Sequence, residues 1–408
     1  MTMTHPLLRP LAPALLALAL TGCIGTGSHA LRDVPVPSRY GHGDPTANTP
    51  DSVAAHALAR APGDIRDDPW WDGFGDPRLS ALVRQVLDRN NDLAAAGLRL
   101  ERARLSAGLS ANALWPQPGG SVSAGANRPV DTGADWSRSH SASVSVGWEL
   151  DLWGRLRGQR DQAAWEAQAT AEDLQSTGLL LVKDTCRLYW QLGYANQAIA
   201  TGEANLERLE RTQQLVQARF DAGEVSRLEV RQAAQNLASQ RASQRQLEQS
   251  RVETRNALTV LLDGQPWPLE DEPQDLSAAV SPALHGGLPA ELLGRRPDLR
   301  AAELRLRSSL RNIAVTKASY YPALSLSGSV GGSSTQLADV LRNPVASLGA
   351  GLTLPFLNLP QARLNTAIAG TDYEIAATTF RKTLYTALSE VDNALSARAS
   401  LGDQVAAA

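Results

Sequence analysis

The 408-residue chain has little of what a compact enzyme or a disulfide-linked domain uses. It has two cysteines, Cys23 and Cys186, so a disulfide framework is not expected. Its six histidines form no close pair, which leaves no metal-ligand set. Only 5% of residues are aromatic, and the composition favours extended helices over a large aromatic core. The formal net charge of -3 gives no reason to expect a nucleic acid partner.

Catalytic patterns are also missing. The sequence contains no nucleophile with a plausible base and no phosphate-binding loop, and its carboxylates are spread along predicted helix faces. We therefore expect no enzyme activity, no cofactor and no bound metal.

Proline is absent from residues 155–220, and apolar residues recur there every seven positions in two columns three residues apart. This spacing predicts a single helix with a coiled-coil face. At 1.5 Å per residue the helix would reach roughly 100 Å, several times the width of an ordinary domain. The columns include Leu174, Leu181, Leu188 and Leu209, and Leu192, Ile199, Leu206 and Phe220.

The first 22 residues predict a lipoprotein signal peptide. A ten-residue apolar run, Leu11 to Leu20, is too short to span a bilayer and ends at Leu20-Thr21-Gly22-Cys23. We expect cleavage before Cys23 and a lipid on its sulfur, which tethers the chain without spanning the membrane. An ordinary leader with a cysteine near its end is the alternative. Residues 23–68, rich in Pro, Gly, Asp and His, predict a lipid-anchored linker.

Strict alternation of apolar and small or polar residues over 141–151 predicts a strand with lipid on one face and water on the other. The water-facing candidates are Ser143, Ser145, Glu149 and Asp151. Glu149 and Asp151 have two interpretations: they give the lumen a negative field, or they bond locally where the strand meets the next helix. With 121–126 as a weaker partner, the segment forms a hairpin over 119–151. Before the hairpin we expect a helix pair or one broken helix, interrupted at Asn90-Asn91-Asp92.

The sequence from 289 onward repeats the earlier pattern. Asp298, Leu299 and Arg305 stand 206 residues after Asp92, Leu93 and Arg99, and Gly351 and Leu354 stand 204 after Gly147 and Leu150. We infer an internal duplication. Repeat 1 (69–288) holds the hairpin, the long helix 155–220, a glycine turn and a returning helix 226–262. Repeat 2 (289–408) holds a hairpin over 322–356, with Ser325 and Ser327 as water-facing candidates, and a long helix from 361.

Four strands pose a geometric problem. An open sheet edge in lipid leaves hydrogen bonds unmade, and about eight strands is the practical minimum for a closed barrel. Copies must therefore contribute together, eight strands in a dimer or twelve in a trimer. The expected fold is mainly α with a small β part, in which long coiled-coil helices continue a membrane barrel as a tube.

Five strings carry a family resemblance: DPWWDGFGDPRLSALV at 68–83, WELDLWGRLR at 148–157, RFDAGEVSRLEV at 219–230, NALTVLLDG at 256–264 and LLGRRPDLRAAELRL at 292–306. The chain resembles the NodT-type lipoprotein branch of the TolC-like outer-membrane efflux proteins. The resemblance implies a homotrimer with a twelve-stranded outer-membrane barrel and a periplasmic helical barrel. It also implies two partners, a periplasmic adaptor and an inner-membrane pump, commonly of the resistance-nodulation-division class. The function it implies is the exit duct of a tripartite efflux pump.

The resemblance also gives roles to residues. The helical-hairpin tip, where the adaptor docks, is matched by Arg219, Phe220, Gly223, Val225, Ser226 and Leu228. A turn that only joins two helices would need the glycine and the cap alone. Aromatic residues near strand ends are candidates for membrane belts: Trp115, Trp148, Trp153, Tyr320, Tyr321 and Phe356. For Trp153 the alternative is packing at the junction between barrel and helix. We expect Cys186 to be a small buried residue and Arg295-Arg296-Pro297-Asp298 to be a helix start with its charges paired or solvated.

One feature departs from the family pattern. With the offset of 204, Ala408 corresponds to Ala204, so repeat 2 lacks a counterpart of residues 205–262. We expect a truncated or frame-shifted gene product that leaks, fails to assemble or docks poorly. The alternatives to a working duct are therefore an inactive truncated channel and a non-conducting, lipid-anchored coiled-coil scaffold. The alternating hairpins argue against the scaffold, which has no use for them.

Overall fold

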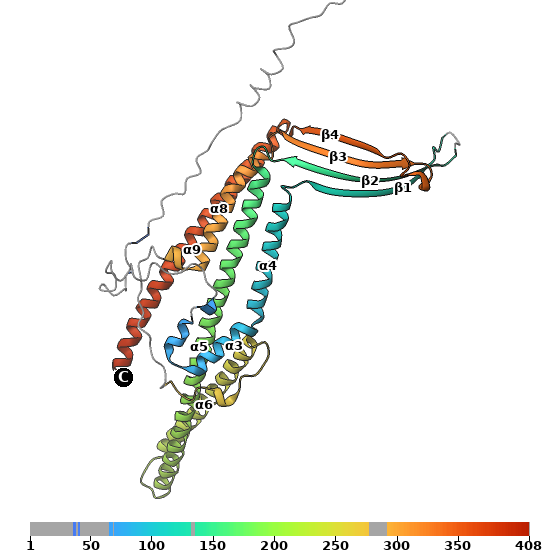
Figure 1. Ribbon diagram of the computed structural model, residues 1–408. Coiled ribbons are helices and arrows are strands. Elements are labelled where there is room, and N and C mark those ends of the chain that lie inside the picture. The colour runs from blue at the N-terminus through green and yellow to red at the C-terminus, as the bar shows by residue number, and fades with distance from the viewer. Residues whose placement is uncertain are drawn as a thin grey trace, which may run out of the picture. The chain divides into compact units, whose positions relative to one another are not determined.

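The seven-residue recurrence and the strict alternation in the sequence correspond to long helices and four strands in the computed structural model (Figure 1). The structure describes residues 36–37, 40, 65–67, 69–131, 135–276 and 292–407, all within the unit Val36–Ala408. The predicted signal peptide, the lipidation of Cys23 and most of the linker lie outside the described residues. The expected fold, mainly α with a small β part, is confirmed.

The elements follow the duplication. The main ones are α3 (Pro77–Arg89), α4 (Asn91–Asn112), β1 (Gln117–Asn127), β2 (Ser137–Leu150), α5 (Arg155–Asp221), α6 (Arg227–Leu261), α8 (Pro297–Ala318), β3 (Ala323–Ser334), β4 (Val345–Thr353) and α9 (Leu359–Ala407). The short ones are η1 (Ile65–Asp67), η2 (Trp70–Phe74), η3 (Leu269–Asp271), α7 (Leu292–Arg295), η5 (Leu337–Asp339) and η6 (Pro355–Leu357). No helix in the described part of the chain is both long enough and apolar enough to cross a membrane.

Side-chain caps divide the first helical segment where the sequence predicts a break. Asp76 accepts hydrogen bonds from the backbone N–H groups of Arg78 and Leu79 at 2.9 and 3.3 Å, and Pro77 occupies the first position of α3. Asn90 ends α3 in an extended conformation and caps α4 by accepting from the N–H groups of Asp92 and Leu93. The segment is therefore two helices joined by one residue.

All four strands form one antiparallel sheet in the order β1-β2-β3-β4. The two hairpins of the duplication thus pair with each other through β2 and β3, where Gly147 lies opposite Ser327. The helices α4, α5, α8 and α9 lie side by side in that order and leave the same end of the sheet (Figure 1). The sheet and the helix layer therefore each have an element of repeat 1 at one edge (β1 and α4) and an element of repeat 2 at the other (β4 and α9).

The main core lies where α3 crosses the middle of α5 and the end of α6. Trp71 of η2 and Trp267 of the segment after α6 close it, and both side chains are buried. A second, smaller core joins α8 to α9. The main core comprises Trp71, Leu79, Leu82, Val83, Val86, Leu87, Leu181, Val182, Cys186, Leu188, Tyr189, Leu192, Leu258, Leu262 and Trp267. The smaller one comprises Leu306, Ile313, Ala369, Tyr373 and Ala377.

A glycine sets the distance between α5 and α8. A Cβ added at Gly158 would collide with Val315, whose branched side chain is stiff, and would lie 3.2 Å from Nε of Arg311. We expect Gly158→Ala to lower the free energy of unfolding by about 1–3 kcal/mol, because the two helices must move apart. The measurement is the thermal unfolding midpoint of the protein in detergent.

Gly108→Ala in α4 is the matched control. No atom lies within 4 Å of a Cβ added there, and alanine has the higher helix propensity, so this change should be neutral or stabilising by up to about 1 kcal/mol. Equal losses of stability in the two variants would contradict a close contact at Gly158.

Candidate functional site

One face of the sheet consists almost entirely of serine and glycine. The register of the three strand pairs places these residues opposite one another across all four strands, and neighbouring hydroxyls bond across β1 and β2, with Ser121 Oγ 2.9 Å from Ser143 Oγ. The face comprises Gly119, Ser121, Ser123, Ser141, Ser143, Ser145, Gly147, Glu149, Ser325, Ser327, Ser329, Gly331, Ser333, Ser347, Gly349 and Gly351. The predicted water-facing serines Ser143, Ser145, Ser325 and Ser327 thus share one face.

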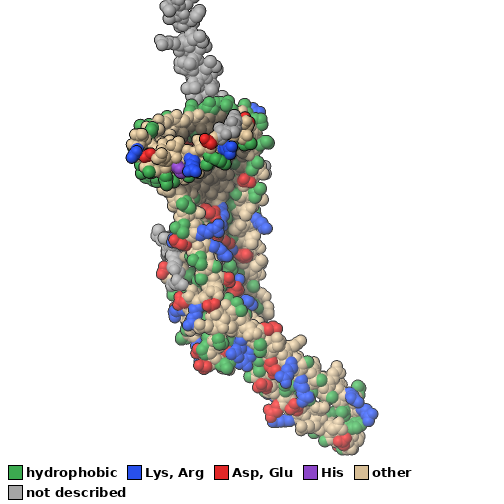
Figure 2. Space-filling view, turned by 90° about the vertical axis from the view of Figure 1, so that its right-hand side faces the viewer, with side chains coloured by type: hydrophobic (Ala, Val, Ile, Leu, Met, Phe, Trp, Pro, Cys, Tyr) green, Lys and Arg blue, Asp and Glu red, His purple; other side chains and the backbone are tan. Residues whose placement is uncertain are grey.

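The opposite face of the sheet is apolar and uncovered. Val122, Val144 and Leu348 are exposed there, as is the indole of Trp148 in part. Apolar surface of this extent is costly in water and favourable against lipid. Figure 2 shows that the sheet end of the unit is hollowed, so the sheet curves as the wall of a barrel does.

Both edges of the sheet are open. Among the described residues β1 pairs only with β2, and β4 pairs only with β3. The outward N–H and C=O groups of these two strands therefore need partners from outside the described part of the chain.

The acidic residues at the end of β2 bond locally. Glu149 pairs with Arg155 at 2.6 Å. Asp151 accepts hydrogen bonds from the N–H groups of Leu156 and Arg157 at 3.0 and 2.9 Å, and its carboxylate lies 3.0 Å from Nε of Arg157. Of the two interpretations drawn from the sequence, the structure supports the local one: the two carboxylates hold the start of α5 and are neutralised there.

The hydrogen bonds at Asp151 also change its acidity. Burial alone would raise the pKa of this carboxyl group. The N–H groups of Arg157 and Leu156, together with the Arg157 guanidinium, outweigh burial and hold the pKa below its usual value. The carboxylate is therefore charged at neutral pH and stabilises the first turn of α5, whose N–H groups have no partner within the helix.

The six candidate belt aromatics all lie at the end of the sheet from which the helices leave, so they can serve one membrane interface and not two. Trp153 Nε1 donates to the carbonyl oxygen of Pro322 at 2.7 Å, and its ring meets that of Tyr321 edge to face at 5.2 Å. Trp148 Nε1 donates to the carbonyl oxygen of Leu114 at 3.0 Å. Trp153 therefore ties repeat 1 to repeat 2, Trp148 ties β2 to the end of the first helical segment within repeat 1, and a belt role stays a prediction.

The second candidate site is the turn between α5 and α6, at the end of the helices far from the sheet (Figure 1). Gly223 has φ +77°, a left-handed conformation that favours glycine. Ser226 and Glu229 form a capping box at the start of α6. Arg219 pairs with Glu224 across the turn at 3.2 Å, and the Leu228 side chain is exposed. The tip is thus a glycine turn followed by a capped helix start, and it presents polar groups around the exposed side chain of Leu228.

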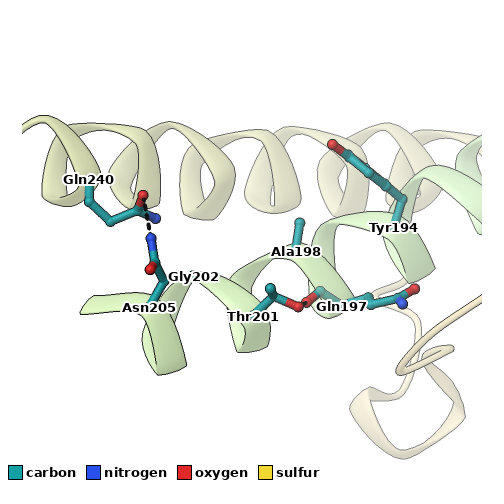
Figure 3. Close-up of a pocket in the computed structure, with 7 residues that line it drawn as sticks. All are labelled: Tyr194, Gln197, Ala198, Thr201, Gly202, Asn205 and Gln240. Carbon is teal, nitrogen blue, oxygen red and sulfur yellow. Dashed lines mark hydrogen bonds between the residues drawn. The ribbon is translucent and has the colours of Figure 1, made fainter. Parts of the chain in front are cut away.

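A groove of about 510 Å³ lies between α5 and α6. Figure 3 shows that Asn205 and Gln240 close one end of it, where Asn205 Nδ2 donates to Gln240 Oε1 at 3.1 Å. Tyr194 lies toward the other end. The lining contains amides, one hydroxyl each from Thr201 and Tyr194, and no carboxylate, histidine or cysteine. The groove therefore offers no pair of groups for acid–base or nucleophilic chemistry.

Two further predictions concern single positions. Cys186 is buried in the main core, and burial raises the pKa of its thiol to about 11, which keeps it protonated at neutral pH. Arg296 pairs with Asp298 at 2.8 Å and with Glu390 of α9 at 2.7 Å. The charges at the start of α8 are therefore paired, as predicted.

The sequence interpretation missed two groups of ion pairs. Arg300 and Arg305 of α8 pair with carboxylates of α5. Glu272, in a segment taken as a plain connector, is buried with Arg251 at 3.2 Å and Arg255 at 2.9 Å. The α5 partners of Arg300 and Arg305 lie 128 to 139 residues away in the sequence, and the only signal was the recurrence of Arg99 as Arg305.

Comparisons with known proteins agree with this geometry. Residues 82–264 and 288–408 match the family described as outer membrane efflux protein. The toluene efflux pump outer membrane protein TtgF of Pseudomonas putida is 30% identical over 96% of this chain and 82% of its own length. Toxin and drug export protein A of Aggregatibacter actinomycetemcomitans is 30% identical over 80% of this chain and 72% of its own. The open state of the Neisseria gonorrhoeae MtrE outer membrane channel aligns with a TM-score of 0.78 at 26% identity, over 94% of this chain and 84% of that one.

The cap at Asp151 has a pH signature. Because its folded pKa is lowered, the carboxylate stabilises the fold fully above the unfolded pKa of about 3.9, and the contribution disappears as pH falls through the folded pKa. We expect Asp151→Asn to cost about 0.5–2 kcal/mol at pH 7 and progressively less below pH about 4. Unfolding midpoints at pH 7 and pH 3 measure the difference. The control Asp131→Asn, at an exposed position, should leave the unfolding midpoint unchanged at both pH values. If Asp151→Asn lowers the midpoint equally at pH 7 and pH 3, the charge of Asp151 is not the cause of the lost stability.

Proposed function

This chain belongs to the outer membrane efflux protein family, and from that premise we propose that copies of it close into the exit duct of a tripartite efflux pump. One observation carries the proposal. The four strands form a sheet with a hydroxyl and glycine face, an apolar face and two open edges. Such a sheet fits one sector of a membrane barrel, with lipid on the apolar side and water on the other.

The open edges determine how copies meet. In lipid the unpaired backbone groups of β1 and β4 need partners, and β1 of one copy supplies what β4 of another lacks. This contact joins different edges of the chain, so repeated rotation closes a ring. We propose three copies and twelve strands, the number that the family resemblance implies.

The helices continue the duct away from the membrane. Since α4, α5, α8 and α9 leave the same end of the sheet, a ring of sheets carries a ring of helices below it. The α5–α6 turn then forms the far end of the duct. We propose that a periplasmic adaptor docks there and links the duct to an inner-membrane pump of the resistance-nodulation-division class.

The wall of the proposed duct gives little basis for selecting cargo. Its hydroxyl face carries a single acidic residue, Glu149, which Arg155 neutralises. The two relatives described above are named for toluene and for toxin and drug export, so cargo differs between similar chains. We propose that the pump selects the substrate and that this chain conducts what arrives. Anchoring through a lipid on Cys23 belongs to the same proposal.

The direct test is conductance. Purified full-length chain reconstituted in planar bilayers should form trimers by native mass measurement and give discrete conductance steps. A monomer without conductance would instead favour the scaffold or the inactive truncated channel.

The tip proposal predicts a local loss of function. Leu228 is 72% exposed in the first turn of α6, and a carboxylate there would be desolvated against an adaptor. We expect Leu228→Asp to raise the susceptibility of a host that depends on this duct by about tenfold or more, while amounts of trimer stay normal.

Val260→Asp is the matched control, because Val260 is 73% exposed on the same helix but in its last turn, away from the tip. It should leave susceptibility unchanged. Equal effects of the two variants would argue against docking at the tip.

A further inference from the structure

The duplication provides an internal template for a contact between copies. Both bounds of α8 lie 206 residues after those of α4, and α9 begins 204 residues after α5. Within the chain, the long helix of repeat 1, α5, packs along α8 of repeat 2. The equivalent contact for the long helix of repeat 2, α9, would be with a helix in the position of α4. In one copy α4 and α9 lie at opposite ends of the helix layer (Figure 1).

Apolar side chains on one face of α4 are exposed in the single copy, as expected if that face packs against a helix of another copy. Val315 of α8 is 6% exposed because it packs against α5 at Gly158, whereas its counterpart on α4, Leu109, is 72% exposed. Leu98 and Leu105 are exposed too, and the spacing of seven and four residues puts all three leucines on one face of α4. This face is therefore the surface that α8 buries against α5.

The template contact is held by ion pairs. Each arginine on this face of α8 meets a carboxylate of α5, and the most buried of these pairs is Arg300 with Glu172 at 2.5 Å. Arg305 pairs with Glu166 at 3.1 Å and Asp173 at 2.5 Å, and Arg311 lies 3.8 Å from Asp161.

The equivalent positions on α4 and α9 have lost all but one of these charges. On α9 the four carboxylates are replaced by Asn365, Gly370, Ala376 and Ala377. On α4 two of the three arginines are replaced, by Ala94 and Leu105, and Arg99 is kept. Loss of the carboxylates alone would leave three arginines of α4 without partners, whereas loss on both helices leaves one, Arg99, whose side chain is exposed.

We infer that α4 of one copy packs on α9 of the next, with apolar and small side chains where the contact between α5 and α8 has ion pairs. The inference rests on the proposed ring of copies and specifies its helical interface. It also explains why one contact has ion pairs and the other has apolar and small side chains. If α4 met α5 of another copy in the place of α8, Glu172 would be buried against Ala94 without the cation that Arg300 supplies. The charges thus prevent the two kinds of contact from exchanging.

A disulfide tests the apposition. The counterparts of the touching pair Val315 and Gly158 are Leu109 and Ala362. In a Cys186→Ala background, the double variant Leu109→Cys, Ala362→Cys should form disulfides between copies on mild oxidation, seen as covalent dimers and trimers on a non-reducing gel. Each single-cysteine variant should give none. The double variant Gly158→Cys, Val315→Cys should form its disulfide within one chain and show no ladder.

The outcomes separate this inference from the proposed function. If native mass measurement shows no trimer, the duct itself is wrong. If trimers form but Leu109→Cys, Ala362→Cys gives no covalent ladder, the duct stands and the assigned interface is overturned.

A charge exchange tests the reason for the difference. Ala94→Arg or Ala376→Glu alone should weaken trimer association in detergent by roughly tenfold or more, because each buries an unpaired charge. The double variant should recover most of the loss, since it rebuilds the pair that Arg300 and Glu172 form within the chain. Single variants without effect, or a double variant no better than either single, would overturn the inference.

Discussion

The unpaired backbone at the two edges of the sheet is the constraint on which the rest of the structure depends. In water an edge strand can bond to solvent, but in lipid each unsatisfied group costs several kcal/mol. A chain with four strands therefore has no stable place in a membrane alone. Its apolar face, its hydroxyl face and the helices that leave one end of the sheet become useful together only when several copies close the edges.

The junction between strands and helices fixes how sheet and helix layer are joined. Asp151 caps α5 by accepting hydrogen bonds from the backbone N–H groups of Leu156 and Arg157. The indole of Trp153 donates to the carbonyl oxygen of Pro322 in the other repeat. Both contacts act at the point where the chain changes from an extended to a helical backbone. The direction of α5 relative to β2 is thus set by polar contacts, in a region where neither core extends.

Much of this could be predicted from the sequence, because the decisive patterns are local. Alternation over 141–151 located the two-faced strand, Asp76 and Gly223 located helix ends, and the offset of 206 located the second repeat. The role of Asp151 was left open because a carboxylate at a strand end serves a water-filled lumen and a helix cap equally well. The pairing of Arg300 with Glu172 spans 128 residues and depends on which helices become neighbours, which no local pattern determines.

A duplicated chain that closes into a ring has a recognition problem that a single repeat does not have. Two similar helix pairs meet two similar partners, one inside the chain and one in the next copy, and identical surfaces would allow either to replace the other. Contact through charged pairs on one side and through alanine and leucine on the other makes every exchange bury an unpaired charge. Divergence between the repeats is in this view as necessary to the duct as their similarity, since similarity gives the ring its regular geometry and divergence gives it a single way to assemble.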